Sequence, residues 1–409
     1  MTTFITFVIV FGLIIFVHEL GHFLAAKFLG VGVKTFAFGF PPRLWSKKIG
    51  ETEYAVNLIP FGGYVKLEGE TEETEEIDTI ILEEKRSGKE RGAKKNSQKS
   101  GKLYDQKPSG LLLIFSAGVL MNILAATVII WFCFIVGFKP IELGEYSQKV
   151  YPGIDGSAGV ISTLEVKIDE VEKNTPAEKE GVKSGDIVLE VDGKKVYFGG
   201  EVVKIIQSKA TDKGARVQLK IKRGNQKLDK TLSTYKSKIK DSKGKELEVN
   251  RVGLVLETTG KLKAGPFSAI SASVTSSWHL TKYTIIGIVD FFGKILTQLK
   301  LSDKVVGPIG LVVVTNYFAH LGLGAIVQFA AILSLSVALF NILPIPALDG
   351  GYIAFTLVEV SSKRKISLKT KNIINLIGFS ALIVLMLFVT FRDFFAFDVW
   401  DFILKLTGR

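Results

Sequence analysis

The chain begins with an apolar run, Phe4 to Leu29, that is long enough to cross a bilayer and yet carries ionisable side chains. A helix needs about 20 apolar residues to span the hydrocarbon layer. This run contains the pentapeptide His18-Glu19-Leu20-Gly21-His22. Each ionisable residue within a span costs about 2.5 to 3.5 kcal/mol on insertion scales, so such residues indicate a function. The run therefore predicts a membrane helix with a polar site inside it.

Histidines at positions i and i+4 lie on one face of a helix, about 6 Å apart along its axis. Both imidazoles of His18 and His22 can then reach one tetrahedral zinc ion, with Glu19 beside it as a candidate general base. The alternative is that the three side chains only make polar contacts between helices. The chain has only 4 histidines, so a chance match to this spacing is rare, and a metal site is favoured.

Hydropathy predicts a multi-spanning protein, since 47% of the 409 residues are hydrophobic. The predicted spans are Phe4 to Leu29, Leu111 to Phe138, Ala325 to Pro346 and Ile373 to Phe391. The first is not expected to be a cleaved signal peptide, because Met1-Thr2-Thr3 carries no basic side chain. The single cysteine, Cys133, cannot form an internal disulfide.

Basic residues flank the predicted spans unevenly, after the first span (Lys27 to Lys48) and before the fourth (Lys363 to Lys371). Such residues favour the cytoplasmic side, so both termini and the domain between spans two and three are expected outside. The net charge of +12 is spread without interleaved aromatic side chains, so no nucleic-acid partner is expected.

A catalytic zinc site usually has three protein ligands, so one more is needed. The third span ends in Pro344, Pro346 and Asp349-Gly350-Gly351, which cannot continue an intact helix. Broken backbone at membrane depth is tolerated where it is buried or lines a cavity, which favours Asp349 as the ligand. Alternatively, Asp349 only ends a helix at the interface. His279 and His320 are rivals without paired spacing.

Several motifs together make the chain similar to the site-2 protease family of intramembrane zinc metalloproteases, most closely the bacterial regulator-of-sigma-E protease branch. They are His18 to His22, Asn341-x-x-Pro344, Leu348-Asp349-Gly350, Gly307-Pro308-Ile309-Gly310, Phe36 to Pro41, and Pro60 to Lys66. One departure is Gly118-Val119 with Asn122, where the family usually has Gly-Pro. We interpret this departure as affecting helix packing more than chemistry.

The resemblance implies zinc bound by His18, His22 and Asp349, with Glu19 activating a water and Asn341 contacting substrate or the developing oxyanion. It also implies regulated intramembrane proteolysis. The expected enzyme is a multi-pass zinc endopeptidase of the bacterial inner membrane. Its expected substrates are transmembrane proteins, such as anti-sigma factors or signal-peptide remnants.

Residues 31–67 alternate apolar and polar positions and predict membrane-associated β-hairpins. An exposed strand edge there would hold an unwound substrate segment by β-addition, or the hairpins are only a connector. Residues 68–109 form a charged loop, acidic up to Glu84 and basic from Lys85. A solvated segment is expected there.

The predicted organisation is a first membrane half (1–138), an extracytoplasmic α+β domain (139–265) and a second membrane half (266–409). The central domain resembles a PDZ domain in its strand at Leu164 to Ile168, its Pro176-Ala177 helix start and its Gly185-Asp186 turn. Such a domain binds extended peptides or filters bulky ectodomains.

Three other functions remain as alternatives. A soluble-type zincin on an anchor would need a helical third ligand downstream. A transporter would show repeated halves, and none is evident. A non-catalytic PDZ scaffold would tolerate the loss of Glu19, which is present.

Overall fold

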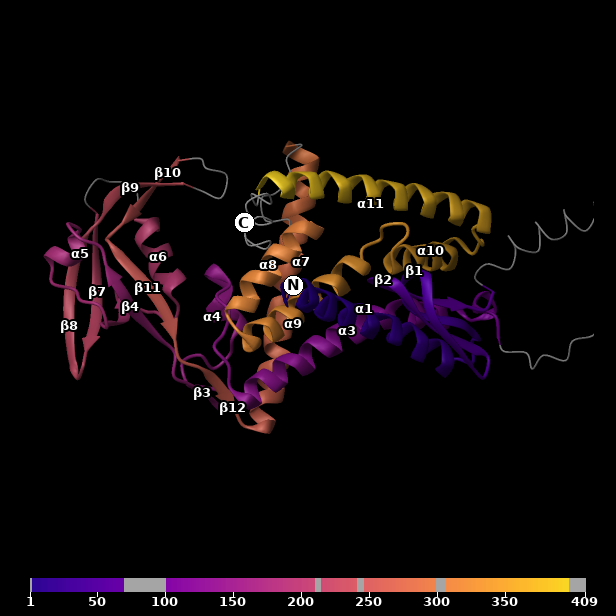
Figure 1. Ribbon diagram of the computed structural model, residues 1–409, viewed down its shortest axis with the longest axis horizontal. Coiled ribbons are helices and arrows are strands. Elements are labelled where there is room, and N and C mark those ends of the chain that lie inside the picture. The colour runs from indigo at the N-terminus through magenta and orange to yellow at the C-terminus, as the bar shows by residue number, and fades with distance from the viewer. Residues whose placement is uncertain (1, 70–100, 210–214, 241–245, 299–306, 397–409) are drawn as a thin grey trace, which may run out of the picture. The chain divides into compact units, whose positions relative to one another are not determined.

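The computed structural model describes residues 2–69, 101–209, 215–240, 246–298 and 307–396, and the chain divides into two compact units. Most of the charged loop predicted at 68–109 lies outside these residues. The first unit comprises residues 1–126 and 333–388, and the second comprises 127–332 and 389–409. Figure 1 shows the elements of each unit, and three long helices run from one unit into the other.

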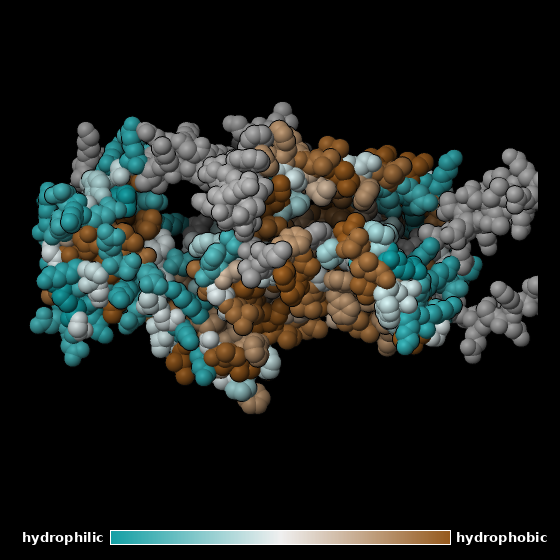
Figure 2. Space-filling view, viewed as in Figure 1, coloured by the Kyte–Doolittle hydropathy of each residue, from teal (hydrophilic) through white to brown (hydrophobic). Residues whose placement is uncertain are grey.

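The first unit contains the elements that hold the candidate site. They are α1 (Thr2–Phe28), β1 (Val33–Ile49), β2 (Thr52–Leu67), the start of α3 (Pro108–Val136), the end of α9 (Leu323–Asn341), α10 (Asp349–Ser362) and most of α11 (Leu368–Ala396). Four helices among the described residues are long and apolar enough to span a membrane: α1, α3, α9 and α11. The prediction of four spans is confirmed at this level. Figure 2 shows hydrophobic side chains gathered over helices and hydrophilic ones over the β-strands of the second unit.

The helix α1 ends because the chain turns left-handed at Gly30, whose φ is +72°. The amide of Val31 then donates to the carbonyl of Ala26 at 2.9 Å. The helix α9 ends at Asn341 and not at Pro346 as predicted. The break is physical, because Pro344 and Pro346 lack the amide hydrogens that a helix needs.

The predicted β-hairpin region is present as the long strands β1 and β2, which pair with each other and lie against α1. Both strands bend, so residues 36–38 pair with residues 63–65 and also with residues 54–56. This segment of β1 is therefore interior to the sheet. Residues 63–65 of β2 have one described pairing partner and form an edge.

The second unit contains an α+β domain, as predicted. Its strands are β3 (Val160–Ser162), β4 (Glu165–Val171), β5 (Ile187–Val191), β6 (Lys194–Lys195), β7 (Arg216–Arg223), β8 (Gln226–Ser233), β9 (Tyr235–Lys240), β10 (Glu246–Arg251), β11 (Leu254–Thr259) and β12 (Leu262–Ala264). Its short helices are α4 (Ser147–Val150), α5 (Pro176–Lys179) and α6 (Gly199–Ser208). The main sheet has the order β11-β4-β5-β7-β8, with β6 beside β5. Alternate residues of β4 and β7, such as Ile168 and Leu219, form its core with α6.

Two further helices of the second unit were not foreseen, α7 (Pro266–Gln298) and α8 (Pro308–His320). The Gly307-Pro308-Ile309-Gly310 motif starts α8. Here the fully buried carboxylate of Asp393 accepts hydrogen bonds from the amides of Gly307 at 2.7 Å and Gly310 at 3.1 Å. Asp393 caps this helix although it lies 86 residues from Gly307 and 83 from Gly310 in the chain. The local sequence therefore gives no signal of the cap.

Candidate metal centre

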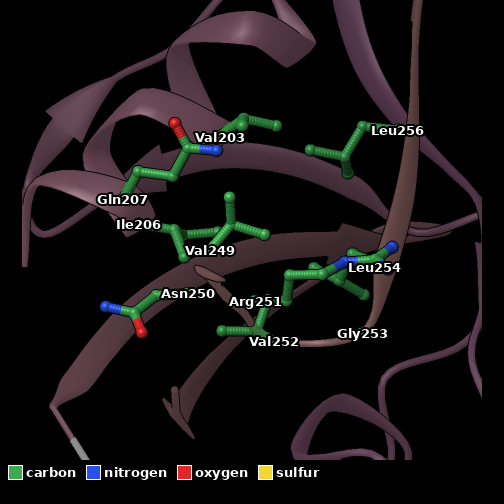
Figure 3. Close-up of a pocket in the computed structure, with 10 residues that line it drawn as sticks. All are labelled: Val203, Ile206, Gln207, Val249, Asn250, Arg251, Val252, Gly253, Leu254 and Leu256. Carbon is green, nitrogen blue, oxygen red and sulfur yellow. The ribbon is translucent and has the colours of Figure 1, made fainter. Parts of the chain in front are cut away.

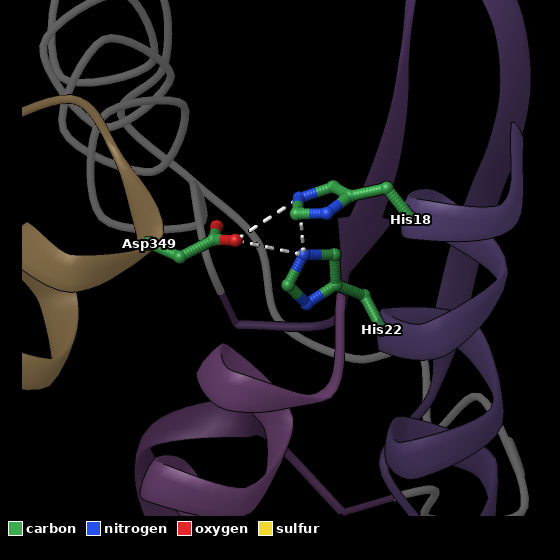
Figure 4. Close-up of side chains that lie close together, drawn as sticks. All are labelled: His18, His22 and Asp349. Carbon is green, nitrogen blue, oxygen red and sulfur yellow. Dashed lines mark hydrogen bonds and ion pairs between the residues drawn. The ribbon is translucent and has the colours of Figure 1, made fainter. Parts of the chain in front are cut away.

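Three side chains that are far apart in the sequence converge in the first unit. The Nε2 atoms of His18 and His22 come from neighbouring turns of α1, and the carboxylate of Asp349 comes from the first residue of α10 (Figure 4). Asp349 Oδ2 lies 3.0 Å from His18 Nε2 and 3.3 Å from His22 Nε2, and the two Nε2 atoms lie 3.3 Å apart. Both histidines are buried. Within the described ranges, this is the one group of three or more His, Cys, Asp or Glu side chains close enough to share a metal ion.

Hydrogen bonds orient both imidazole rings. His22 Nδ1 lies 2.8 Å from the carbonyl oxygen of Ile114, so Nδ1–H donates and Nε2 presents its lone pair to the centre. His18 Nδ1 lies 3.5 Å from the amide nitrogen of Asn122, whose Oδ1 is buried without a hydrogen-bond partner among the described residues. Rotating this amide by 180° lets Oδ1 accept from His18 Nδ1–H. Both histidines would then present Nε2 to the same point.

These residues fit a zinc ion. Two lone-pair nitrogens and a carboxylate oxygen at these distances repel one another unless a cation lies between them. Asp349 Oδ2 is buried and accepts no hydrogen bond from a described residue, which leaves it available as a ligand. Ligands placed tetrahedrally at 2.0 to 2.2 Å from zinc lie about 3.3 to 3.6 Å apart, a few tenths of an ångström or less from the separations found here. Two histidines with one carboxylate are a donor set of catalytic zinc sites.

Gly118 of α3 forms one wall of the centre. A Cβ atom at this position would lie 2.7 Å from Cε1 and 2.8 Å from Nε2 of His18, and it would also collide with His22 Nε2. Only glycine leaves room for the two imidazoles. Our interpretation that the departure from Gly-Pro at Val119 affects helix packing more than chemistry stays a prediction, whereas Gly118 and Asn122 themselves lie against the histidines. The signal in the sequence for this role was the Gly-x-x-x-Asn spacing, which places Gly118 and Asn122 on one face of the helix.

The other predicted site residues lie close by. Asn341, the last residue of α9, places Nδ2 3.4 Å from His18 Nε2. Glu19 is half-buried next to His18 on α1. A Cβ atom on Gly63 of β2 would lie 2.9 Å from Glu19 Cγ, so the edge segment 63–65 begins directly against this glutamate. The rival histidines, His279 on α7 and His320 on α8, are not part of the cluster.

The second unit has a separate concave surface between α6 and β11 (Figure 3). It is a cavity of about 310 Å³ lined by Val203, Ile206 and Gln207 of α6, by residues 249–253, and by Leu254 and Leu256 of β11. Its lining is mainly aliphatic. The strand β11 is the last strand of the main sheet, so the cavity runs along a sheet edge.

The substitution Gly118→Ala tests whether the histidines need this space. We expect zinc affinity to fall by about tenfold to a hundredfold, because the new methyl group displaces both rings. Zinc content per purified chain, measured against a chelator of known affinity, reports the change. Gly110→Ala on the same helix is the matched control, since its Cβ would meet nothing closer than 3.3 Å. Equal zinc affinity in both variants would contradict the assignment.

Comparisons with known proteins find relatives along most of the chain. Residues 6–385 match the model of peptidase family M50. A Clostridium perfringens protein named as a zinc metalloprotease, CPE1693, is 30% identical over 389 residues, which cover 94% of this chain and 96% of that protein. The regulator of sigma-W protease RasP of Bacillus subtilis is 29% identical, over 96% of this chain and 98% of that protein. A PDZ domain of Listeria monocytogenes, from the SdrC-like protein Lmo2051, is 23% identical over 22% of this chain and 85% of its own, with a TM-score of 0.18. The predicted resemblance is thus confirmed: the chain belongs to peptidase family M50, the site-2 protease family of zinc metalloproteases.

Proposed function

We propose that this metalloprotease cuts peptide bonds inside membrane-spanning segments, with zinc held by His18, His22 and Asp349. The observation that carries the proposal is that Asp349 of α10 meets two histidines of α1, a helix long and apolar enough to span a bilayer. A protease built on such a helix meets its substrate at membrane depth. The buried histidines and the half-buried Asp349 give the site the partly water-excluded surroundings in which electrostatic catalysis is strong.

Zinc held there supplies Lewis acidity, which polarises a scissile carbonyl and acidifies water. Glu19 accepts a proton from the attacking water and returns it to the leaving amine. The Asn341 amide, 3.4 Å from His18 Nε2, is placed to donate to the substrate carbonyl as negative charge develops on its oxygen.

A helical substrate hides its own peptide bonds, so the enzyme must hold an unwound segment. The edge segment 63–65 of β2 suits this role, because it can pair with an added strand and begins against Glu19. Residues 36–38 do not suit it, since both of their sides are already paired within the sheet. A substrate strand on this edge would lie beside the general base.

For orientation, we propose that both termini and the α+β domain lie outside the bacterial inner membrane. Basic side chains after α1 and around the start of α11 support this, because such residues favour the cytoplasmic side. A cysteine introduced at the exposed Lys194 should then react with an impermeant thiol reagent added outside intact cells. Reaction only after cell lysis would indicate the opposite orientation, with the α+β domain inside the cell.

The substrate class is proposed from the relatives. The name of the B. subtilis relative describes regulation of sigma-W, which supports anti-sigma factors as substrates, together with other single-span proteins already trimmed on their outer side. The cavity between α6 and β11 supports a role for the PDZ-like domain in receiving the new substrate terminus. An aliphatic cavity along a sheet edge is the feature that binds extended peptides by strand addition.

The substitution Glu19→Gln tests the chemistry. We expect the variant to keep its zinc, because Glu19 is not among the three ligand atoms. Cleavage of a transmembrane substrate should fall by at least a hundredfold, because an amide cannot take up the proton. The rates of product formation by the variant and the wild type are compared at equal protein concentration and equal zinc content. Retention of a tenth of the wild-type rate would remove Glu19 from the mechanism.

The substitution Val203→Glu tests the domain cavity. It puts a charge on a half-exposed wall residue of α6, so a trimmed substrate should bind several-fold more weakly while its kcat stays the same. Ser208→Glu, on the same helix but outside the cavity, is the control. If both variants show the wild-type KM, the cavity does not receive substrate.

A further inference from the structure

A second cavity lies in the first unit, away from the metal ligands. It has a volume of about 700 Å³, within the range of sites that bind small molecules. One side comes from residues that precede and begin α3, and the other from the second half of α10 and the start of α11. None of the zinc-site residues lines it. The long apolar helices α3 and α11 both begin at its walls.

The walls of this cavity carry an excess of positive charge. Five cationic side chains line it, against the carboxylates of Asp105 and Glu359. The five are Lys102, Lys363, Arg364, Lys365 and Lys371. One cation is neutralised inside the wall, where the buried Lys371 Nζ lies 2.8 Å from Glu359 Oε1. Lys363, Arg364 and Lys365 therefore leave the wall cationic, with Asp105 as the one other carboxylate in the lining.

The loop between α10 and α11 is fixed in place, which makes the cationic wall a built feature. Glu359 Oε1 also accepts a hydrogen bond from the amide of Ile366 at 2.8 Å. The side chain of Ser367 caps α11 by accepting from the amide of Thr370 at 3.1 Å. Within the loop that the bond from Ile366 to Glu359 closes, Lys363, Arg364 and Lys365 are exposed, and no ion pair joins them to another described residue.

The same cavity also has apolar walls. Leu111 of α3, Val360 of α10 and Leu368 of α11 line it beside the cations. The first turns of α3 and α11 add the partial positive charge of two helix N-termini. The ligand must therefore present an anionic group next to an apolar one, at the level where two spans leave the hydrocarbon layer.

We propose that this cavity binds the phosphate headgroup of an anionic phospholipid whose acyl chains lie along α3 and α11. Basic pockets between spans on the cytoplasmic side are suited to such headgroups. A soluble phosphate would use the cations but not the apolar wall. The bound lipid contacts Thr356 and Val360 of α10, the helix that begins with the metal ligand Asp349.

The test uses the full-length protein, purified in a neutral detergent and titrated with phosphatidylglycerol or phosphatidylcholine, with lipids per chain counted by native mass spectrometry. The wild type should retain one phosphatidylglycerol at a concentration at least tenfold below that needed for phosphatidylcholine. Arg364→Gln with Lys365→Gln should weaken phosphatidylglycerol retention about tenfold or more, because each basic residue contributes to the attraction. Arg364→Lys with Lys365→Arg keeps both charges and should bind as the wild type does.

The matched control is Lys47→Gln with Lys48→Gln, which removes two exposed charges from β1, outside the cavity. It should retain phosphatidylglycerol as the wild type does. Equal retention of the two lipids by the wild type would overturn the proposal, and so would an equal loss in the control variant. Competition by millimolar glycerol 3-phosphate would also overturn it, because the site would then bind a soluble phosphate. If the Gln variant does not fold, loss of lipid selectivity in the charge-keeping variant is the contradicting result.

Discussion

Electrostatic repulsion among three lone-pair atoms is the constraint on which this structure depends. His18 Nε2, His22 Nε2 and Asp349 Oδ2 lie 3.0 to 3.3 Å apart in surroundings that are largely buried. A cation at the centre removes this repulsion, and holding the three side chains so close together requires precise support from other elements. Ile114 and Gly118 of α3 supply that support by orienting one imidazole and leaving space for both.

The break between α9 and α10 follows from the same constraint. A continuous helix would carry Asp349 past the histidines, whereas the proline-containing segment lets a new helix begin at Asp349 itself. The break has a conformational cost, visible at Ala347, a non-glycine residue with φ of +73°. Asn375 of α11 helps to hold this segment by accepting a hydrogen bond from the Ala347 amide at 3.1 Å.

The sequence predicted those features that depend on local pattern. Spacing placed His18 and His22 on one helix face, hydropathy placed the spans, and the need for a third ligand led to the proline-broken segment with Asp349. The roles of Gly118, Asn122 and Asp393 were missed, because each acts on a residue about 80 or more positions away. The double pairing of residues 36–38 was missed for a related reason, since alternation identifies a strand but not its neighbours in a sheet.

X-ray absorption at the zinc edge tests the central claim most directly, because it reads the ligand atoms without relying on activity. In purified wild-type protein, we expect a first shell that contains two imidazole nitrogens and one carboxylate oxygen. In Asp349→Asn, the carboxylate contribution and most of the bound zinc should be lost. A wild-type spectrum with one imidazole or none would contradict the account, as would an Asp349→Asn protein with unchanged spectrum and zinc content.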